Sequence, residues 1–283
     1  MADYQNTLVY REEWTDKLQE RLSEPNKWKD ICNVEYTNTK VLHNPYLTDP
    51  SISALVRGCS YTVAAMTETD DNVSIDGGNI IASFIDDADA AQSTFLKQME
   101  MADRQAVLLN EGIETAVYAA HASFTDFTNT AIGGGAGSIT VSLTNIDNII
   151  TGVRREINEA KGSSLLERNG GFFVWRPADL EILEQFCMMN GFAFADNVLE
   201  NGITSGKRAL GMTHYSSNLL PAGRVVAGVK KAIHLGICRS TYGKITTVQD
   251  GGGVAGIVIR SRTDHKVKVW NKLVPVVFDV AVV

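Results

Sequence analysis

The strongest hydrophobic pattern in this sequence runs from residue 88 to residue 124, where apolar residues recur every three or four positions. Ten such steps cover 36 residues, which gives the 3.6-residue period of a straight α-helix. At roughly 1.5 Å per residue, the predicted helix is about 55 Å long. Asp86, Asp87 and Asp89 stand at its start, where the helix dipole favours acidic residues. A helix of this length with one apolar stripe needs a long surface to lie on.

Apolar and polar residues alternate in the segment before this helix, as they do in β-strands. The alternation has two runs, around Tyr61–Ala65 and Val73–Ile85, and the polar segment TETDDN separates them. Asp76, Gly77 and Gly78 supply a second bend. We therefore predict a long β-hairpin over residues 53–85. Because an isolated two-stranded hairpin is marginally stable in water, its apolar side chains need a neighbour.

The N-terminal stretch has one short periodic segment. Trp14, Leu18 and Leu22 are spaced by four residues among charged ones, which predicts an amphipathic helix over residues 8–22 that ends before Pro25. The sequence from there to Pro50 is irregular and rich in turn-forming residues. We interpret this stretch as an arm that lies on another part of the molecule.

The second half of the chain mixes helical and strand patterns. We predict helices over Leu143–Ala160 and from Pro177, which suits a first helical position, and a buried strand over Phe172–Trp175. Pro275 is expected at an edge or bulge of the last strand. The other predicted β segments are His214–Leu219, Arg224–Val229, Gly256–Ile259 and Val267–Val282. This order of elements predicts the α+β class.

Composition places the chain among ordinary globular proteins. Its 283 residues are 44% hydrophobic and 21% charged, which excludes the disordered, collagen-like and disulfide-scaffold classes. The start of the chain has no signal-peptide pattern, and no apolar run approaches the ~20 residues of a membrane span, so we expect a cytosolic protein without a membrane partner. The four scattered cysteines, Cys32, Cys59, Cys187 and Cys238, are expected to be reduced structural thiols.

Charge is strongly segregated along the chain. Lys and Arg minus Asp and Glu gives −2 for residues 1–40, −7 for 41–90, −7 for 91–203 and +9 for 204–283. Such asymmetry can indicate a nucleic-acid surface, but no recognition motif accompanies it. Acidic and basic regions that face each other, within a subunit or between copies, would also produce it. A third explanation is that strand-rich segments simply carry the lysines and helical ones the glutamates.

No segment has the residue spacing of a known catalytic or cofactor site. Gly202–Arg208 has three residues instead of four between its glycines and no hydroxyl residue after Lys207, so it is not a phosphate loop. The clusters Gly133–Gly137 and Gly251–Gly253 do not form GxGxxG. The five histidines are far apart and lack metal-ligand spacing. We therefore expect no cofactor, no metal and no catalytic residue.

Several segments resemble the major capsid proteins of tailed bacteriophages, which have the Hong Kong 97-like fold. Val73–Ser93, VSIDGGNIIASFIDDADAAQS, is similar to the passage in which the E-loop strand of that family returns into the spine helix. Gly171–Phe186 and Gly211–Leu220 resemble A-domain segments, and Gly256–Arg262 resembles a P-domain strand. The resemblance covers essentially the whole chain. It implies an N-terminal arm (1–52), an E-loop hairpin (53–85), a P-domain with the spine helix (86–138), an A-domain (139–235) and closing P-domain strands (236–283).

The resemblance implies a non-enzymatic function. A major capsid protein self-assembles, through hexamers and pentamers, into the icosahedral shell of a virion in the host cytoplasm, and the shell encloses double-stranded DNA that it binds non-specifically. A portal protein and a separate scaffolding protein are implied partners, and a cement protein is left open. No Lys occurs between Lys40 and Lys97, so the hairpin provides no lysine for covalent cross-links. The arm is too short to hold a fused scaffolding extension, so we expect little N-terminal proteolysis.

We predict that the hairpin contacts an adjacent subunit and that its acidic tip meets basic residues of the C-terminal segment. Burial of large aliphatic side chains, at about 1.5–3 kcal/mol each, should hold the copies together, and charge should align them. The predicted hairpin contacts are Val63, Asp70, Asp71, Ile75, Asp76, Ile81 and Phe84, and the predicted basic partners are Lys230, Lys231, Arg260, Arg262, Lys266 and Lys268. Two alternatives remain: an encapsulin-like bacterial compartment, and an α+β enzyme in which His121 or His214 acts as a general base.

Overall fold

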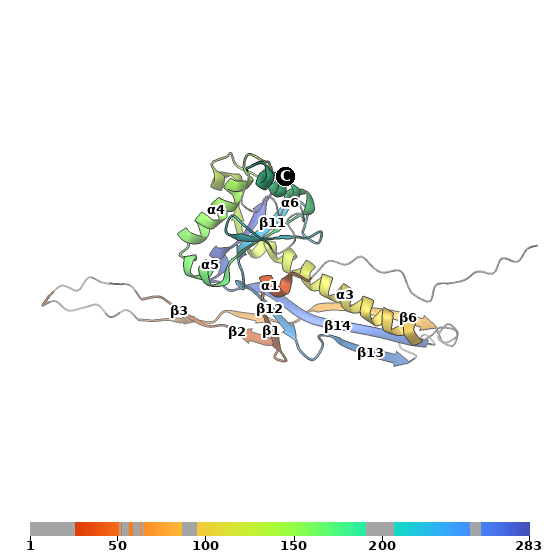
Figure 1. Cartoon of the computed structure of the whole chain (residues 1–283). Coiled ribbons are helices and arrows are strands. Elements are labelled where there is room, and N and C mark those ends of the chain that lie inside the picture. Colours follow the sequence, from red (N-terminus) through yellow and green to blue (C-terminus); the bar gives the residue numbers. More distant parts are fainter. Residues whose placement is uncertain are drawn as a thin grey trace, which may run out of the picture.

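The computed structural model describes residues 26–50, 52, 57–58, 63, 65–86, 95–190, 207–249 and 256–283. The fold is α+β, as predicted from the sequence. A domain built on a six-stranded sheet stands above an extended region in which a long helix lies along a second sheet, and a thin hairpin projects from this region to the left, away from β6 (Gly78–Asp86) and β13 (Lys244–Gln249) (Figure 1). The helix predicted over residues 8–22 lies outside the described residues.

The predicted long helix is present as α3 (Phe95–Ala119), which continues as the 3₁₀ turn η1 (Ala120–Ser123). Residues 87–94, where the pattern places its start, lie outside the described residues. The surface beneath α3 is a sheet of its own chain (Figure 1). The buried Gln105 joins the two: its amide donates to Ser83 Oγ (2.8 Å) and to the Ile259 carbonyl (3.1 Å), and its oxygen accepts from Ser261 Oγ (2.7 Å).

This lower sheet is organised around its longest strand, β14. The first half of β14 pairs with β6 and β13, and its second half pairs with β12. β6 approaches β14 closely at Gly78, where a Cβ atom would lie 2.1 Å from the Thr263 carbonyl oxygen, so only glycine fits there. The strands are β1 (Asn33–Thr37), β12 (Ile233–Cys238), β14 (Gly256–Val269), β13 (Lys244–Gln249) and β6 (Gly78–Asp86).

The projecting hairpin lies earlier in the chain than predicted. β2 (Val41–His43) pairs with β5 (Asn72–Ser74), and β3 (Tyr46–Leu47) pairs with β4 (Glu68–Thr69), all antiparallel. The prediction of a hairpin over residues 53–85 is therefore wrong in its boundaries, because β6 belongs to the lower sheet. The polar segment TETDDN lies on the returning arm and is not the tip. Apolar and polar residues alternate through both β5 and β6. Such alternation predicts a strand, but it does not show which other strand it pairs with.

The upper domain confirms most of the predicted elements of residues 139–235. The helix at residues 143–160 is α4, the buried strand at 172–175 is β8, and Pro177 begins α6. The sheet, in spatial order, consists of β7 (Thr125–Phe127), β15 (Val277–Ala281), β11 (Arg224–Val229), β8 (Gly171–Trp175), β10 (Met212–Ser216) and β9 (Lys207–Ala209). The helices are α4 (Ile146–Glu159), α5 (Ser163–Asn169) and α6 (Pro177–Met189), and a 3₁₀ turn, η2, spans Asn129–Ile132.

The last predicted strand, Val267–Val282, is two strands in two different sheets. β14 ends at Val269, and β15 crosses to the upper sheet, where it pairs with β11 and β7. Pro275 lies in the 3₁₀ turn η4 (Val274–Val276) between them, instead of at a bulge inside a strand. The segment predicted to close the lower region therefore also supplies a central strand of the upper domain.

A buried carboxylate joins the N-terminal arm, the long helix and the upper domain. Glu114 of α3 accepts hydrogen bonds from the Lys27 backbone N–H (3.0 Å), Tyr118 Oη (2.8 Å) and Ser217 Oγ (3.3 Å). Burial raises the pKa of this carboxyl above its usual value, against the effect of these hydrogen bonds. The short helix α1 (Trp28–Ile31) is thereby held at the junction, with Trp28 fully buried.

The described cysteines are free thiols, in agreement with the sequence prediction. Cys32 and Cys187 are buried, and desolvation raises their pKa values to about 12 and about 11, so both remain protonated near neutral pH. Cys238 is partly exposed, and Cys59 lies outside the described residues.

His214 is a fully buried histidine of β10 that the core holds in its neutral form. Its Nδ1 accepts a hydrogen bond from Trp175 Nε1 (2.9 Å), so the proton resides on Nε2, which donates to the Ala209 carbonyl (3.0 Å). Desolvation lowers its pKa to about 4. Protonation of Nδ1 would place its N–H opposite the indole N–H of Trp175, so that two donors would face each other without an acceptor.

The first prediction is that His214 makes the fold sensitive to acid. A depressed folded-state pKa contributes stability above the ordinary pKa near 6.5, and this contribution is lost as the pH falls toward 4. We expect His214 to account for about 2 kcal/mol of the loss in unfolding free energy between pH 7.5 and pH 5. In His214→Asn, the amide oxygen replaces Nδ1 as the acceptor. Urea unfolding at both pH values should therefore show that its unfolding free energy falls by about 2 kcal/mol less than that of the native protein. The exposed His43→Asn is the control; an equal pH dependence in all three proteins contradicts the prediction.

Candidate inter-subunit surface

The hairpin extends away from both sheets of its own chain (Figure 1). It has two strands and no further pairing partner among the described residues. Its outer part also exposes large apolar side chains: Ile52 and Val63 are 102% and 79% exposed, and Leu47 and Met66 are each more than half exposed. A two-stranded ribbon with uncovered apolar side chains is a surface that another molecule can cover.

The root of the hairpin is fixed to the lower sheet by ion pairs and apolar packing. Asp71, 4% exposed, accepts from Lys268 Nζ (2.5 Å) and from the Asn271 backbone N–H (2.8 Å). Asp76 pairs with Lys266 at 3.8 Å. The absence of a side chain at Gly236 makes room for Ile75 and Leu42, whose Cδ1 atoms would lie 3.0 and 3.1 Å from an added Cβ.

A third ion pair lies slightly further out, where Asp49 meets Lys272 at 3.2 Å. In all three pairs an acidic residue from the −7 segment at 41–90 meets a basic residue from the +9 segment at 204–283. The interpretation that acidic and basic regions face each other within a subunit therefore holds at the root of the hairpin. The sequence did not identify Asp49 or Lys272 as partners, because Pro45 and Pro50 made the outgoing arm of the hairpin look irregular instead of strand-like.

Two of the predicted contact residues are buried inside their own chain. Asp71 and Ile75 belong to the root, so their assignment to contacts with another subunit is corrected. Val63, Asp70 and Phe84 are exposed, and Asp70 accepts from His43 Nδ1 at 2.9 Å and from Asn72 Nδ2 at 3.0 Å. Ile81 and Phe84 lie on β6, outside the hairpin, with Ile81 partly buried.

The six predicted basic partners divide into two groups. Lys266 and Lys268 hold the root, Lys230 pairs with Asp30 of the arm at 2.7 Å, and Lys231 Nζ donates to the Lys29 and Cys32 carbonyls at 2.8 and 2.9 Å. These four act within the chain. Arg260 and Arg262 are exposed on β14, where Arg262 pairs with Asp264 at 2.7 Å.

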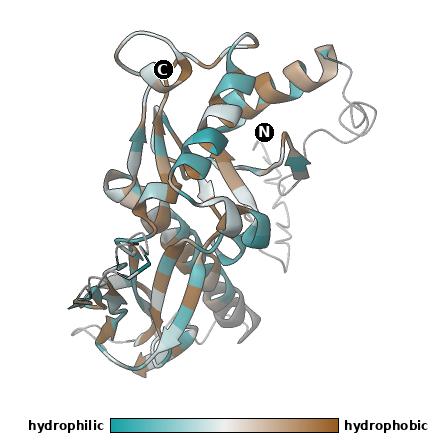
Figure 2. Ribbon diagram, turned by 90° about the vertical axis from the view of Figure 1, so that its left-hand side faces the viewer, coloured by the Kyte–Doolittle hydropathy of each residue, from teal (hydrophilic) through white to brown (hydrophobic). Residues whose placement is uncertain are grey.

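Arg260 and Arg262 lie on an open face of the lower sheet, opposite α3. Paired residues of antiparallel strands project to the same side, and the register aligns three rows across β6, β14 and β13. The rows are Ile80, Arg262 and Lys244; Ala82, Arg260 and Thr246; and Phe84, Val258 and Val248. A hollow of about 310 Å³ lies over the basic part of this face. Hydrophilic and hydrophobic residues alternate along the strands (Figure 2).

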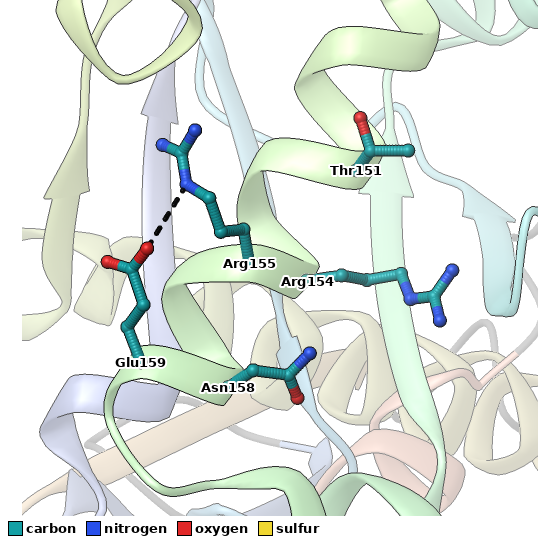
Figure 3. A pocket seen from close by; sticks show the side chains of 5 residues that line it. All are labelled: Thr151, Arg154, Arg155, Asn158 and Glu159. Carbon is teal, nitrogen blue, oxygen red and sulfur yellow. Dashed lines mark ion pairs between the residues drawn. The ribbon is translucent and has the colours of Figure 1, made fainter.

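The enzyme alternative would need a site at a hollow of the upper domain or at one of two histidines. One hollow, of about 460 Å³, lies over α4; there Arg155 is paired with Glu159 at 3.5 Å, and Arg154 points to the other side of the helix, toward the Leu210 carbonyl (Figure 3). The two histidines of the enzyme alternative are both engaged. His214 is in the core, and His121 Nδ1 lies 3.0 Å from Asp279, which also accepts from Arg224.

The described residues also lack two other kinds of feature. They contain no cluster of three or more His, Cys, Asp or Glu side chains placed to hold a metal ion. Nor does any of their helices combine the length and the apolar character that crossing a bilayer requires.

Comparisons with known proteins identify the fold. No protein-family model and no curated protein sequence matches the chain. A structure of Mycobacterium phage Che8 matches with a TM-score of 0.74 and 18% identity over 97% of each chain. The capsid of the native GTA particle matches at 0.69 and 14% identity, covering 99% of this chain and 97% of the other. The mature capsid of bacteriophage PhiM1 matches at 0.64 and 12% identity, covering 97% and 92%. The resemblance predicted from the sequence is thus confirmed for the fold.

The second prediction is that the Asp71 carboxylate holds the hairpin to the sheet. A hydrogen bond to a charged group contributes about 1.5–3 kcal/mol, and Asp71 accepts two bonds that link the hairpin to β14 and the turn after it. In Asp71→Ala, hydrogen exchange of the paired amides of β2 and β5 should therefore accelerate while exchange in β8 stays unchanged. The matched control is Glu68→Ala, an exposed acidic residue on the same arm of the hairpin. Equal protection of β2 and β5 in both variants contradicts this role.

Proposed function

We propose that this chain is a major capsid protein, which assembles with copies of itself into the icosahedral head shell of a tailed phage around double-stranded DNA. One observation carries the proposal: a chain whose fold matches capsid structures along 97% or more of its length also projects a ribbon that has no further pairing partner in the part of the chain that the structure describes.

The geometry supports a head-to-tail contact between copies. The hairpin leaves one side of the molecule, and the open face of β6, β14 and β13 lies toward the other (Figure 1). The hairpin exposes apolar residues together with Glu68 and Asp70, and the open face exposes Phe84 and Ile80 together with Arg260. Surfaces of opposite charge on opposite sides make a heterologous contact, which closes rings when the rotation between copies allows it.

Further partners follow from this function. A portal protein, a separate scaffolding protein and non-specifically bound DNA would join the coat protein, in a virion assembled in the host cytoplasm. Electron microscopy of purified particles, combined with a measurement of their nucleic-acid content, separates this function from the encapsulin-like alternative. Uniform closed shells that package double-stranded DNA support it, and DNA-free shells that enclose a protein cargo contradict it.

The third prediction concerns the apolar outer part of the hairpin. Ile52→Asp replaces a fully exposed aliphatic side chain by a carboxylate, so the isolated subunit loses no core contact, whereas an assembled one loses about 1.5–3 kcal/mol at each contact. We expect folded subunits, by circular dichroism, that form few closed particles in electron micrographs. Ile52→Val, which keeps most of the apolar surface, should assemble normally. Normal shells from Ile52→Asp would refute the role of this residue.

The fourth prediction separates the two kinds of contact by ionic strength. Exposed ion pairs contribute about 0–1 kcal/mol each and are screened at a Debye length of about 10 Å in 0.1 M salt, whereas apolar burial is not screened. Raising the salt concentration from 0.05 to 0.5 M should therefore slow assembly and leave the final yield of shells nearly unchanged. Light scattering measures both the rate and the yield. Loss of assembly at moderate salt, with subunits still folded, would mean that charge and not burial holds the copies together.

A further inference from the structure

His234 is a buried imidazole without a hydrogen-bond partner, next to the root of the hairpin. Its side chain is 3% exposed, and neither ring nitrogen makes a hydrogen bond among the described residues. A neutral imidazole carries one donor and one acceptor, and leaving both unpaired in the interior costs free energy. Such a group calls for an explanation beyond packing.

The surroundings of His234 connect it to the hairpin. On β12 it is the register partner of Lys268 on β14, and its ring lies 4.8 Å from the Trp270 ring. Lys268 Nζ holds Asp71 and the Asn72 carbonyl, both at 2.5 Å, and lies over the Trp270 ring at 5.3 Å. The cation opposite His234 is therefore the one that fixes the root.

Charged groups from four elements face this region. They are Glu35 on β1, Lys266 and Lys268 on β14, Lys272 in the turn that follows, and Asp71 and Asp76 at the root. Glu35 favours a charged His234, with its carboxylate 3.7 Å from Nε2, but it is 53% exposed, and such a pair contributes at most about 1 kcal/mol. Burial acts in the other direction and is the larger of the two effects.

The neutral ring is therefore the form compatible with a closed root. Desolvation by burial lowers the pKa of His234 from its ordinary value of 6.5, and Glu35 offsets this only in part. A lowered folded-state pKa means that the closed root is favoured above pH 6.5 and loses this contribution as the pH falls below it.

We propose that protonation of His234 releases the projecting hairpin at acidic pH. Protonation of the buried imidazole places a second cation opposite Lys268. The root then separates from the β12–β14 sheet, so that the imidazolium reaches water. The release is a property of the single chain. Its consequence, a change in the direction of the hairpin toward a neighbouring copy, rests on the proposed function.

Hydrogen exchange of the full-length soluble subunit at pH 7.5 and pH 5.5, corrected for intrinsic rates, tests the release. Exchange in Val41–His43 and Asn72–Ile75, relative to β8, should increase about tenfold at the lower pH in the native protein and stay unchanged in His234→Gln. The reference to β8 removes the acid sensitivity that His214 gives to the core. The matched control is His265→Gln, a second buried histidine that projects from the opposite face of β14 and should keep the response.

A measurement on the native protein keeps the proposal testable if His234→Gln does not fold. The ring resonances of His234, followed by NMR with labelled histidine, should titrate with the same midpoint as the opening of the root. Different midpoints, a root that stays closed at pH 5.5, or an undiminished response in His234→Gln each overturn the proposal. Because the subunit is not assembled in these experiments, failure to form shells does not affect their outcome.

Discussion

The structure depends on a two-stranded ribbon that is secured only where it leaves the sheet. Beyond the root, the hairpin has no third strand and no helix among the described residues to cover its apolar side chains, so these side chains stay exposed in the single subunit. The ion pairs of Asp71 and Asp76, together with Ile75 and Leu42 packed at Gly236, fix where the ribbon starts and in which direction it leaves. Under the proposed function, another copy of the chain would cover these side chains.

Local patterns predicted the elements well, and pairings over long sequence distances poorly. The 3.6-residue period of α3, the buried strand β8 and the Pro177 start of α6 follow from residue spacing and backbone chemistry, which act over a few residues. The partner of β6 is β14, more than 170 residues away, and no local pattern specifies it. The same limit explains why β15 was assigned to the lower region, because a run of valines identifies a buried strand and not the sheet that contains it.

The charge pattern was more informative than the choice of individual contact residues. Segment totals of −7 and +9 left three explanations open, and three ion pairs at and near the root support the one in which the two regions face each other, within one chain. Which acids pair internally and which remain exposed depends on burial, which the sequence does not reveal. Asp70 and Asp71 are neighbours in the sequence, yet one is half exposed and the other is buried against Lys268.

Strand β14 gives the candidate surfaces a fixed separation. Its first half carries Arg260 and Arg262 on the open face, and its second half carries Lys266 and Lys268 on the same side, where the hairpin root is fixed. Fourteen residues at about 3.4 Å each give roughly 45 Å between its ends. Since β14 is paired along its whole length and α3 packs against its other face, this distance cannot change without breaking the sheet. Under the proposed function, adjustment to different angles between neighbouring copies would therefore come from the root, where Asp71 and Lys268 lie beside a histidine without a hydrogen bond.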